Sequence, residues 1–360
     1  MSWFLAFAGF AALIILHELG HFTAAKAVGM RVERFSLFFG RTRLRWQRGE
    51  TEYGVGWLPL GGFVKITGMN PAEEIPPEVA HRAYYRQPVW KRLVVIAAGP
   101  AVNIALAFVI LTGLYWSIGD VRHAKPNNRI EETTPGSAAA GVLKRGDHIL
   151  AVDGRTGDPT TLRKRIASHH CTGKPKSGCK AAEPVTLTIQ RGDARVTAKA
   201  TPVYDAQVKR PLLGFAFAVT QPPIGPLTAA ELSVDKMWFF TSGTVSTIAQ
   251  IFKAEKRKEV SGVVGSYEAT RKSIEVGPQE ALFLLAVISL SLGVINLFPF
   301  LPLDGGHIFW ALAEKVRGRA IPFAVMERAG FVGFALVIML ALIGLTNDIG
   351  RLTGEGFDVR

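Results

Sequence analysis

Four long apolar stretches constrain the fold of this chain more than any other feature of its sequence. They lie near residues 3–27, 93–118, 281–301 and 320–345. A helix needs roughly 20 largely apolar residues to cross the hydrocarbon core of a bilayer, and each stretch provides them. The sequence therefore predicts a polytopic α-helical membrane protein with about four transmembrane helices.

The composition indicates that another part of the chain lies in water. Hydrophobic residues make up 48% of the 360 residues, and charged residues still make up 20%. This balance is typical of membrane helices joined to a water-exposed domain. The formal net charge of +13 suggests an anionic partner, either nucleic acid or a membrane face. Because arginine clusters lie beside the apolar stretches and no nucleic-acid motif accompanies them, we expect the lipid bilayer and no nucleic acid.

The first apolar stretch could be a secretory signal peptide. It lacks a basic region at its start and a convincing cleavage site. It also contains His17, Glu18 and His21, and ionisable residues in a membrane segment are costly unless they serve a function. We therefore expect this stretch to be retained as a membrane helix.

Basic residues in the short loops set the expected orientation. The residues concerned are Arg31, Arg34, Arg41, Arg43, Arg45 and Arg48, then Arg82, Arg86, Lys91 and Arg92, then Lys315, Arg317, Arg319 and Arg328. All three clusters fall on one side if the four helices alternate, and the positive-inside rule makes that side cytoplasmic. We expect a multi-pass protein of the inner (cytoplasmic) membrane. Both termini and residues 119–280 would then lie outside.

Residues 53–66, YGVGWLPLGGFVKI, differ from the apolar stretches. They are rich in glycine, aromatic and β-branched residues, and Pro59 and the pair Gly61-Gly62 interrupt them. This pattern predicts a membrane-associated β-hairpin or short sheet near the cytoplasmic membrane face. A surface hairpin without a role in substrate binding is the alternative. Residues 70–81 are rich in proline and acidic residues and indicate a loop.

The outside segment contains the pattern of a known domain. Residues 137–154, SAAAGVLKRGDHILAVDG, indicate a helical start, a Gly-Asp turn and an alternating strand. The pattern resembles the PDZ fold in Gly146, Asp147, Ile149, Val152, Asp153 and Gly154. We expect an inserted extracytoplasmic PDZ (β-rich α+β) domain at 122–204, with later strands at 184–190 and 195–203. No carboxylate-binding loop is evident, so peptide binding by strand addition stays open.

The two cysteines, Cys171 and Cys179, both fall in this outside domain and flank a short TGKPKSG insertion. In an oxidising exterior compartment, a disulfide is expected between them. A His/Cys metal cluster is the alternative, because His169 and His170 lie nearby. Residues 228–255 form a mildly amphipathic helix candidate. The expected division of the chain is 1–118 for the first membrane part, 122–204 for the PDZ domain, 205–280 for an outside linker region and 281–350 for the last membrane part.

The motif HELGH gives the clearest indication of chemistry. His17 and His21 are four residues apart, so on a helix they project from one face at the separation of zinc ligands. Glu18 follows the first histidine and can act as a general base on a metal-bound water. The alternative is a chance HExxH in which these side chains only satisfy one another in a core.

A catalytic zinc ion usually has three protein ligands, so a third ligand is needed. The segment NLFPFLPLDGGH (296–307) places Asp304 just past an apolar helix, in a stretch broken by proline and glycine. Broken backbone at membrane depth is tolerated where it is buried or lines a cavity. Asp304 is the predicted third ligand, Gly305-Gly306 lets the chain turn close to the metal, and His307 is a competing candidate.

These motifs together resemble the site-2 protease family of intramembrane zinc metalloproteases, and within it the bacterial regulator-of-sigma-E protease branch. The matching motifs are HELGH, PLGGFVK (59–65), GPAVN (99–103), SGVVG (261–265) and NLFPFLPLDGG. They cover most of the chain in the order found in the family. The sequence departs from the best-known members of this branch in two ways. It has a single PDZ domain where they carry two, which puts substrate filtering in doubt. Pro302 lies one position later than the corresponding proline, but the Asn296–Asp304 spacing is unchanged.

The resemblance implies a zinc ion (Zn²⁺) held by His17, His21 and Asp304, with Glu18 as the catalytic base. It also implies that Asn296 contacts the substrate backbone and that the segment at Gly61-Gly62 pairs with the substrate. Asn103, in the second span, is a weaker candidate for stabilising the site, and it is placed in the same substrate-binding set. The implied reaction is cleavage of transmembrane segments within the bilayer, close to its cytoplasmic side. The implied substrates are single-span proteins already trimmed outside, such as anti-sigma factors or remnant signal peptides.

Three other functions would share parts of this pattern. A membrane-anchored zinc peptidase for soluble peptides is disfavoured because Asp304 lies in a membrane segment. A non-catalytic PDZ scaffold would be free to lose Glu18, which is intact. A transporter or channel predicts paired repeats, and none is evident.

Overall fold

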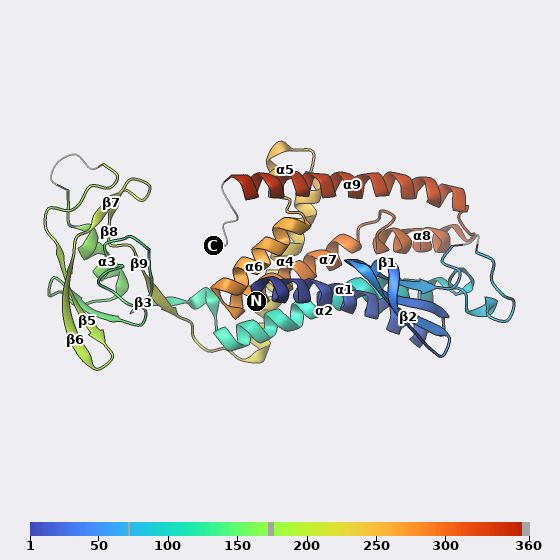
Figure 1. Cartoon of the computed structure of the whole chain (residues 1–360), viewed down its shortest axis with the longest axis horizontal. Helices are drawn as coiled ribbons and strands as arrows, with labels where there is room; N and C mark the ends of the chain where they lie inside the picture. The colour runs from blue at the N-terminus through green and yellow to red at the C-terminus, as the bar shows by residue number, and fades with distance from the viewer. Residues whose placement is uncertain (71–72, 172–175, 355–360) are drawn as a thin grey trace. The chain divides into compact units, whose positions relative to one another are not determined.

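The structure is a computed structural model that describes residues 1–70, 73–171 and 176–354. The chain divides into two compact units. Unit 1 consists of Met1–Ser117 and Gly225–Arg360, and unit 2 consists of Ile118–Ile224 (Figure 1).

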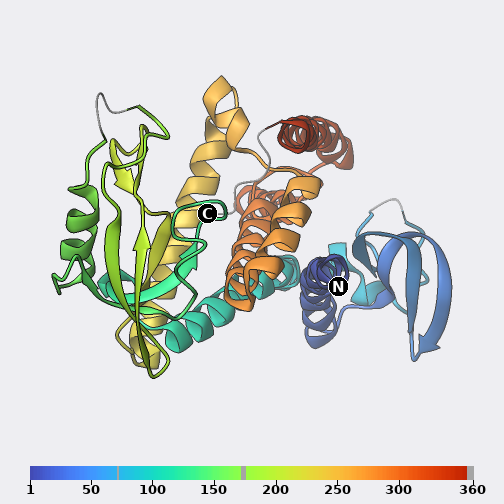
Figure 2. The same ribbon diagram turned by 60° about the vertical axis from the view of Figure 1, so that its left-hand side comes forward.

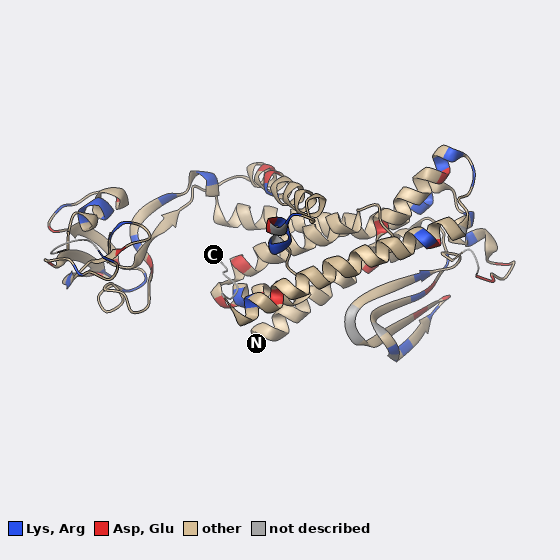
Figure 3. Ribbon diagram, turned by 90° about the horizontal axis from the view of Figure 1, so that it is seen from above, with Lys and Arg blue, Asp and Glu red and all other residues tan. Residues whose placement is uncertain are grey.

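Four helices in the described part of unit 1 are long and apolar enough to cross a membrane. They are α1 (Ser2–Ala27), α2 (Val89–Ile118), α7 (Pro278–Asn296) and α9 (Phe323–Thr353). They coincide with the four predicted apolar stretches. Charged residues are sparse along these helices and frequent at helix ends and on the hairpin described next (Figure 3). The orientation of the helices stays a prediction.

A long β-hairpin follows α1, formed by β1 (Val32–Arg48) and β2 (Thr51–Ile66). The strands are antiparallel with several irregularities, and Gly40 and Gly61 adopt φ values of 89° and 82° that favour glycine. Both strands contact α1, on the side away from the other helices (Figure 2). A β-hairpin or short sheet was predicted within residues 53–66 alone. In the structure these residues belong to β2, and two separate segments of β2 pair with Arg34–Leu37 of β1, namely Gly62–Lys65 and Glu52–Val55.

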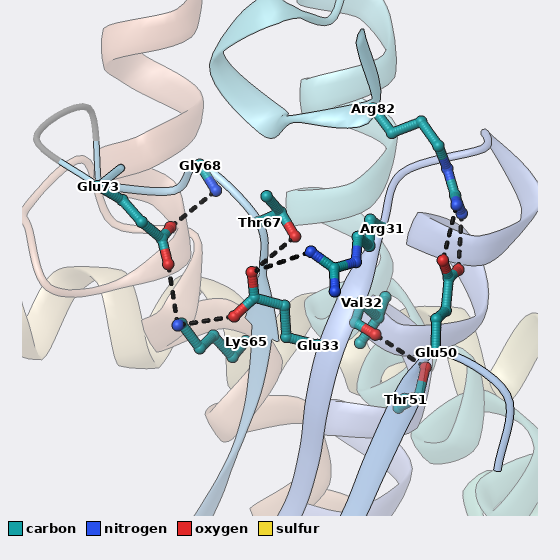
Figure 4. A network of polar contacts seen from close by, with 10 residues as sticks. All are labelled: Arg31, Val32, Glu33, Glu50, Thr51, Lys65, Thr67, Gly68, Glu73 and Arg82. Carbon is teal, nitrogen blue, oxygen red and sulfur yellow. Dashed lines mark hydrogen bonds and ion pairs between the residues drawn. The ribbon is translucent and has the colours of Figure 1, made fainter. Parts of the chain in front are cut away.

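Ion pairs fix the base of this hairpin to the loop that follows it (Figure 4). Lys65 Nζ lies 2.7 Å from Glu33 Oε2 and 2.9 Å from Glu73 Oε1. Arg82 donates two hydrogen bonds of 2.7 Å to Glu50. These contacts lower the pKa of both Glu50 and Glu73, because an adjacent cation favours the charged carboxylate. The contacts of Lys65 and Glu50 therefore anchor β2, the strand that contains the Gly61-Gly62 pair.

Shorter helices complete unit 1. They are α4 (Pro226–Ala249), α5 (Ala254–Glu259), α6 (Val263–Val276) and α8 (Asp304–Arg317), with single 3-10 turns at Ala80–Arg82 and Tyr84–Arg86. Helix α6 packs against α1, α7 and α9, and α4 packs against α7. The predicted helix at 228–255 corresponds to α4, which ends at Ala249.

Helix α9 is joined to α6 by a buried carboxylate. Asp348 accepts hydrogen bonds from the backbone N–H groups of Gly262, at 3.1 Å, and Gly265, at 2.8 Å, and from Ser261 Oγ at 3.3 Å. These donors lie in the SGVVG motif at the N-terminus of α6, where a negative charge is stabilised by the free N–H groups. A Cβ on Gly262 would lie 2.6 Å from Asp348 Oδ2, so the contact also requires glycine there.

Replacing Asp348 by Ala should destabilise unit 1 by about 1–3 kcal/mol, because buried N–H groups lose their acceptor. Urea unfolding in detergent, followed by circular dichroism, measures the change. Asp348→Asn keeps one acceptor oxygen and should cost less. Thr346→Ala on the same helix removes only a local hydroxyl contact and is the matched control. Equal stability of Asp348→Ala and Thr346→Ala would contradict this role.

Unit 2 is a β-rich domain with one short helix, α3 (Pro159–Ala167). Its five-stranded sheet has the order β6-β5-β4-β3-β9 and is antiparallel throughout. The strands are β3 (Lys125–Thr133), β4 (His148–Val152), β5 (Val185–Arg191), β6 (Ala194–Ala200) and β9 (Phe215–Thr220), with a small hairpin of β7 (Val203–Asp205) and β8 (Arg210–Leu212) and a 3-10 turn at Val121–His123. Alternate residues of β5 are buried beneath α3, as a half-buried strand requires.

The compact unit is longer than the domain predicted at 122–204. Strand β9 pairs with β3, so residues 205–224 belong to unit 2 and not to a linker. The rest of the predicted linker forms α4, α5, α6 and the start of α7. The ends of the unit lie together, because the Asp120 N–H donates to the Pro222 carbonyl at 2.8 Å.

The predicted disulfide is present in unit 2. Cys171 and Cys179 are bonded, with their Cα atoms 6.1 Å apart. The residues 172–175 of the enclosed insertion lie outside the described residues. Because both sulfur atoms are in the disulfide, the alternative His/Cys cluster has no thiolates. His169 Nε2 instead lies 3.3 Å from Asp153 Oδ2.

Candidate metal centre

The two histidines of HELGH occupy one buried face of α1, because residues four apart on a helix are neighbours. His17 and His21 each expose 8% of their surface. Helix α2 covers this face at close range. A Cβ on Gly20 would lie 2.7 Å from the carbonyl oxygen of Ala98, so glycine at this position allows the two helices to approach.

Asp304 reaches the histidines from the first position of α8. Helix α7 ends at Asn296, and the broken segment between the helices turns the chain back. A Cβ on Gly305 would overlap the Leu297 carbonyl, and one on Gly306 the backbone at Leu301. The two glycines therefore allow this tight turn, and Asp304 begins a helix where an acidic side chain is favourable.

The three donor atoms have the spacing of zinc ligands. Nε2 of His17 and of His21 lie 3.2 and 3.4 Å from Asp304 Oδ2, and 3.3 Å from each other. Donors bound tetrahedrally at about 2.0–2.1 Å from zinc lie about 3.3–3.4 Å apart. His17, His21 and Asp304 could therefore hold a zinc ion together and would leave a position for water or substrate.

The contacts of His21 also fit a bound cation. Its Nδ1 lies 2.9 Å from the Val95 carbonyl oxygen, which can only accept a hydrogen bond. Nδ1 of the neutral ring therefore carries the proton, and Nε2 presents a lone pair to the site. Asp304 Oδ2 is buried without a hydrogen-bond partner among the described residues. A lone pair facing an unpaired carboxylate oxygen fits a bound metal ion.

The donors line a pocket of about 460 Å³. Other residues of its wall are Glu18, Gly61, Gly62, Asn296, Pro302 and His307. Strand β2 passes directly over the glutamate, since a Cβ on Gly62 would lie 3.0 Å from Glu18 Cγ. The pocket therefore brings together the donors, the predicted base and the predicted hairpin segment. His307 lines the pocket but is not among the three converging donors.

Asn103 differs from the other predicted substrate-binding residues, because it does not line this pocket. It is fully buried behind the donors, and its Nδ2 lies 3.3 Å from His17 Nδ1. The sequence could not place Asn103 behind His17, because that position depends on how α1 and α2 pack.

Two further contacts were missed by the sequence analysis. A Cβ on Gly99 would overlap the His21 ring, so this glycine of the GPAVN motif makes room for a donor. Arg92 on α2 donates hydrogen bonds of 2.9 and 2.7 Å to Glu314 on α8 and holds the helix that carries Asp304. For the contact between Gly99 and His21, the only indication in the sequence was the GPAVN motif itself.

Comparison with known proteins identifies the family. The family model described as peptidase family M50 matches residues 5–340. The chain belongs to peptidase family M50. Its resemblance to the site-2 proteases is thereby confirmed, and the M50 assignment makes the chain a metalloprotease with zinc as its metal.

Several curated M50-like relatives are similar over nearly their whole length. "Zinc metalloprotease Rip1" of Mycolicibacterium smegmatis is 32% identical, with 92% of this chain and 91% of the relative covered. The Mycobacterium tuberculosis (H37Rv) protein of the same name is 28% identical, with 93% and 94% covered. A relative from Nostoc sp., whose name also contains the words zinc metalloprotease, is 29% identical over 99% and 98%.

Solved structures match a smaller part of this M50 chain. The PDZ domain of the SdrC-like protein from Listeria innocua is 17% identical and covers 25% of this chain and 92% of its own, with a TM-score of 0.21. The corresponding domain from Listeria monocytogenes is 19% identical and covers 26% and 88%, also with a TM-score of 0.21.

Proposed function

We propose that this M50 metalloprotease cleaves transmembrane segments of membrane proteins within the bilayer. The observation that carries the proposal is the position of the donors. His17 and His21 lie on α1, a helix apolar enough to span a membrane, and their ring nitrogens converge with the Asp304 carboxylate. Ionisable residues in such a segment mark a functional site by default.

His17, His21 and Asp304 would hold the zinc ion. When bound, zinc lowers the pKa of a water molecule and polarises the substrate carbonyl. Glu18 follows His17 on α1 and lines the same pocket. We assign to Glu18 the removal of a proton from the attacking water and its transfer to the departing amine nitrogen. His307 is given no role.

The substrate must lose helical hydrogen bonds before its backbone can reach this pocket. Strand β2 offers a partner, because its Gly61-Gly62 segment passes over Glu18 without side chains. We propose that an extended substrate adds to β2 at this position, which replaces part of the lost hydrogen bonding. Asn296, at the end of α7 and in the pocket wall, would contact the substrate backbone.

Unit 1 also has an apolar groove of about 850 Å³. It is lined by α2, α4 and α7, and its last residues, Leu297 to Pro299, directly follow Asn296. Its walls are almost entirely apolar, as a lipid-facing site for a helix requires. This apolar groove favours an apolar substrate segment over a soluble peptide.

We further propose the inner membrane as the location, with unit 2 outside as a PDZ-like domain and the active site towards the cytoplasm. The basic clusters support this orientation through the positive-inside rule. The substrate classes follow the resemblance stated above, namely anti-sigma factors or remnant signal peptides. Partners are then single-span proteins trimmed outside and the lipid bilayer.

Reconstitution tests the proposal. The purified protein and a single-span substrate, with tags at both ends, are placed in the same liposomes. Mass spectrometry of the products should locate the cut inside the apolar segment of the substrate. Cleavage of soluble peptides alone, with the embedded substrate intact, would instead indicate a membrane-anchored peptidase.

Unit 2 should act as a size filter. Its ends are adjacent at Asp120 and Pro222, so residues 121–221 can be replaced by a short Gly/Ser linker without separating α2 from α4. Under exclusion, this excision lets the enzyme cut untrimmed substrate and leaves trimmed substrate unaffected. Slower cleavage of trimmed substrate, with untrimmed substrate still protected, would show that unit 2 recruits a new C-terminus. The two substrates are compared in the liposome assay described above.

A further inference from the structure

The motif GPAVN (99–103) has no part in the reaction proposed above, yet it lies directly behind both histidines. At its start, Gly99 leaves room for the His21 ring, and the nearby Val95 carbonyl accepts the His21 Nδ1 proton. At its end, the side chain of Asn103 faces His17. One turn of α2 therefore contacts both donor rings on the side away from the pocket.

The contact between Asn103 and His17 lies in a closed environment. Asn103 is fully buried, and its side-chain nitrogen is 3.3 Å from Nδ1 of His17. The other end of the amide, Oδ1, is buried and has no hydrogen-bond partner among the described residues. A buried amide oxygen without a donor is costly, so this arrangement calls for an explanation.

The position of the proton on the His17 ring explains the unpaired oxygen of Asn103. Its Nε2 faces Asp304 Oδ2 at 3.2 Å and His21 Nε2 at 3.3 Å. If Nε2 is a metal donor, the proton of the neutral ring lies on Nδ1, which then needs an acceptor. The nitrogen and oxygen of an asparagine amide exchange places when the group rotates by 180°. Such a rotation brings the unpaired Oδ1 to Nδ1 and moves Nδ2 to the position that Oδ1 held, so that the proton on Nδ1 gains an acceptor.

We propose that Asn103 is a positioning residue for the metal centre: its amide oxygen accepts the Nδ1 proton of His17. The bond keeps the Nε2 lone pair directed at the zinc site and fixes the ring plane. This inference rests on the ligand set proposed above. It gives each histidine an acceptor from α2, a backbone carbonyl for His21 and a side-chain amide for His17. Such outer partners typically contribute 10–100-fold in metal affinity.

The surroundings of Asn103 hold it in place. Its backbone carbonyl accepts a hydrogen bond of 2.9 Å from Ser289 Oγ on α7. A Cβ on Gly293 would lie 3.0 Å from the Pro100 carbonyl oxygen and 3.3 Å from Asn103 Cβ, so α7 presses directly on this turn. Asn103 therefore connects α1, which carries two donors, with α7, which leads to the third.

The zinc affinity of the purified full chain, measured by competition with a chelator, tests the proposal. Asn103→Leu removes the acceptor at similar size and should weaken zinc binding about 10–100-fold. Asn103→Asp keeps an acceptor in place and should bind zinc nearly as tightly as the parent. Thr112→Ala, on the same helix, removes only a hydroxyl contact with Ser233 of α4 and should match the parent. The spectrum of the Co²⁺ form should change in Asn103→Leu alone.

Unchanged zinc affinity in Asn103→Leu, or an equal loss in Asn103→Asp, would overturn the inference. If the leucine variant does not fold, Asn103→Ala replaces it without adding bulk beside Gly293. His17→Ala separates the two levels of the argument. Loss of zinc in His17→Ala with normal binding in Asn103→Leu contradicts only the role of Asn103. Full zinc affinity in His17→Ala contradicts the ligand set itself.

Discussion

Replacing Glu18 by Gln should reduce cleavage by about 10²–10⁴-fold while zinc stays bound. Glutamine has nearly the same size but cannot accept a proton from the attacking water. It leaves His17, His21 and Asp304 unchanged, so the donors keep their spacing of 3.2 to 3.4 Å. The rate is measured on the reconstituted single-span substrate, and zinc is measured by atomic absorption on the same sample.

Glu231→Gln is the matched control, because Glu231 is an exposed residue of α4 outside the pocket. It should cleave like the parent. Full activity of the Glu18→Gln enzyme would remove Glu18 from the mechanism. Loss of both zinc and activity would instead make Glu18 part of the support for the donors.

Replacing Asp304 by Ala should release the metal. The parent should hold about one zinc per chain, because three protein donors and one open position form a catalytic site. Without the carboxylate, only His17 and His21 remain, and α8 no longer has a donor that connects it to α1. Zinc content and cleavage should fall together, and added zinc should not restore the parent rate.

Asp235→Asn, an exposed carboxylate on α4, serves as the control and should keep zinc and activity. His307→Ala distinguishes the competing ligand. It should retain zinc, since His307 is not among the converging donors. Zinc retained in Asp304→Ala but lost in His307→Ala would exchange the roles of the two residues.

Local patterns were sufficient to predict the long apolar helices and to single out the three residues that converge in the structure. The length of each apolar stretch can be read directly from the sequence. His17 and His21 are four residues apart, so they lie on one face of a helix regardless of what packs against it. Asp304 was found because a carboxylate at a Pro/Gly break beside an apolar helix is unusual. The structure refines this position, since Asp304 begins α8 and does not lie within the third span.

Non-local pairing was beyond the sequence. The partner of residues 53–66 is the arginine-rich β1. The basic residues of this segment had been expected to lie in a loop. Similarly, β9 pairs with β3 across nearly all of unit 2, so the domain extends past its last recognisable strand pattern. The contact of Asn103 with His17 depends on how α1 and α2 pack, and the spacing within either helix does not reveal it.

The distribution of the donors along the chain has a consequence for biosynthesis. His17 and His21 lie in the first helix, whereas Asp304 follows unit 2 and helices α4 to α7. A chain still emerging from the ribosome therefore carries two donors without the third. Because structural assembly and metal binding are coupled, tight zinc binding becomes available only when α8 has been made and has reached α1. Nascent molecules thus remain without a complete catalytic centre until their own membrane segments have been synthesised.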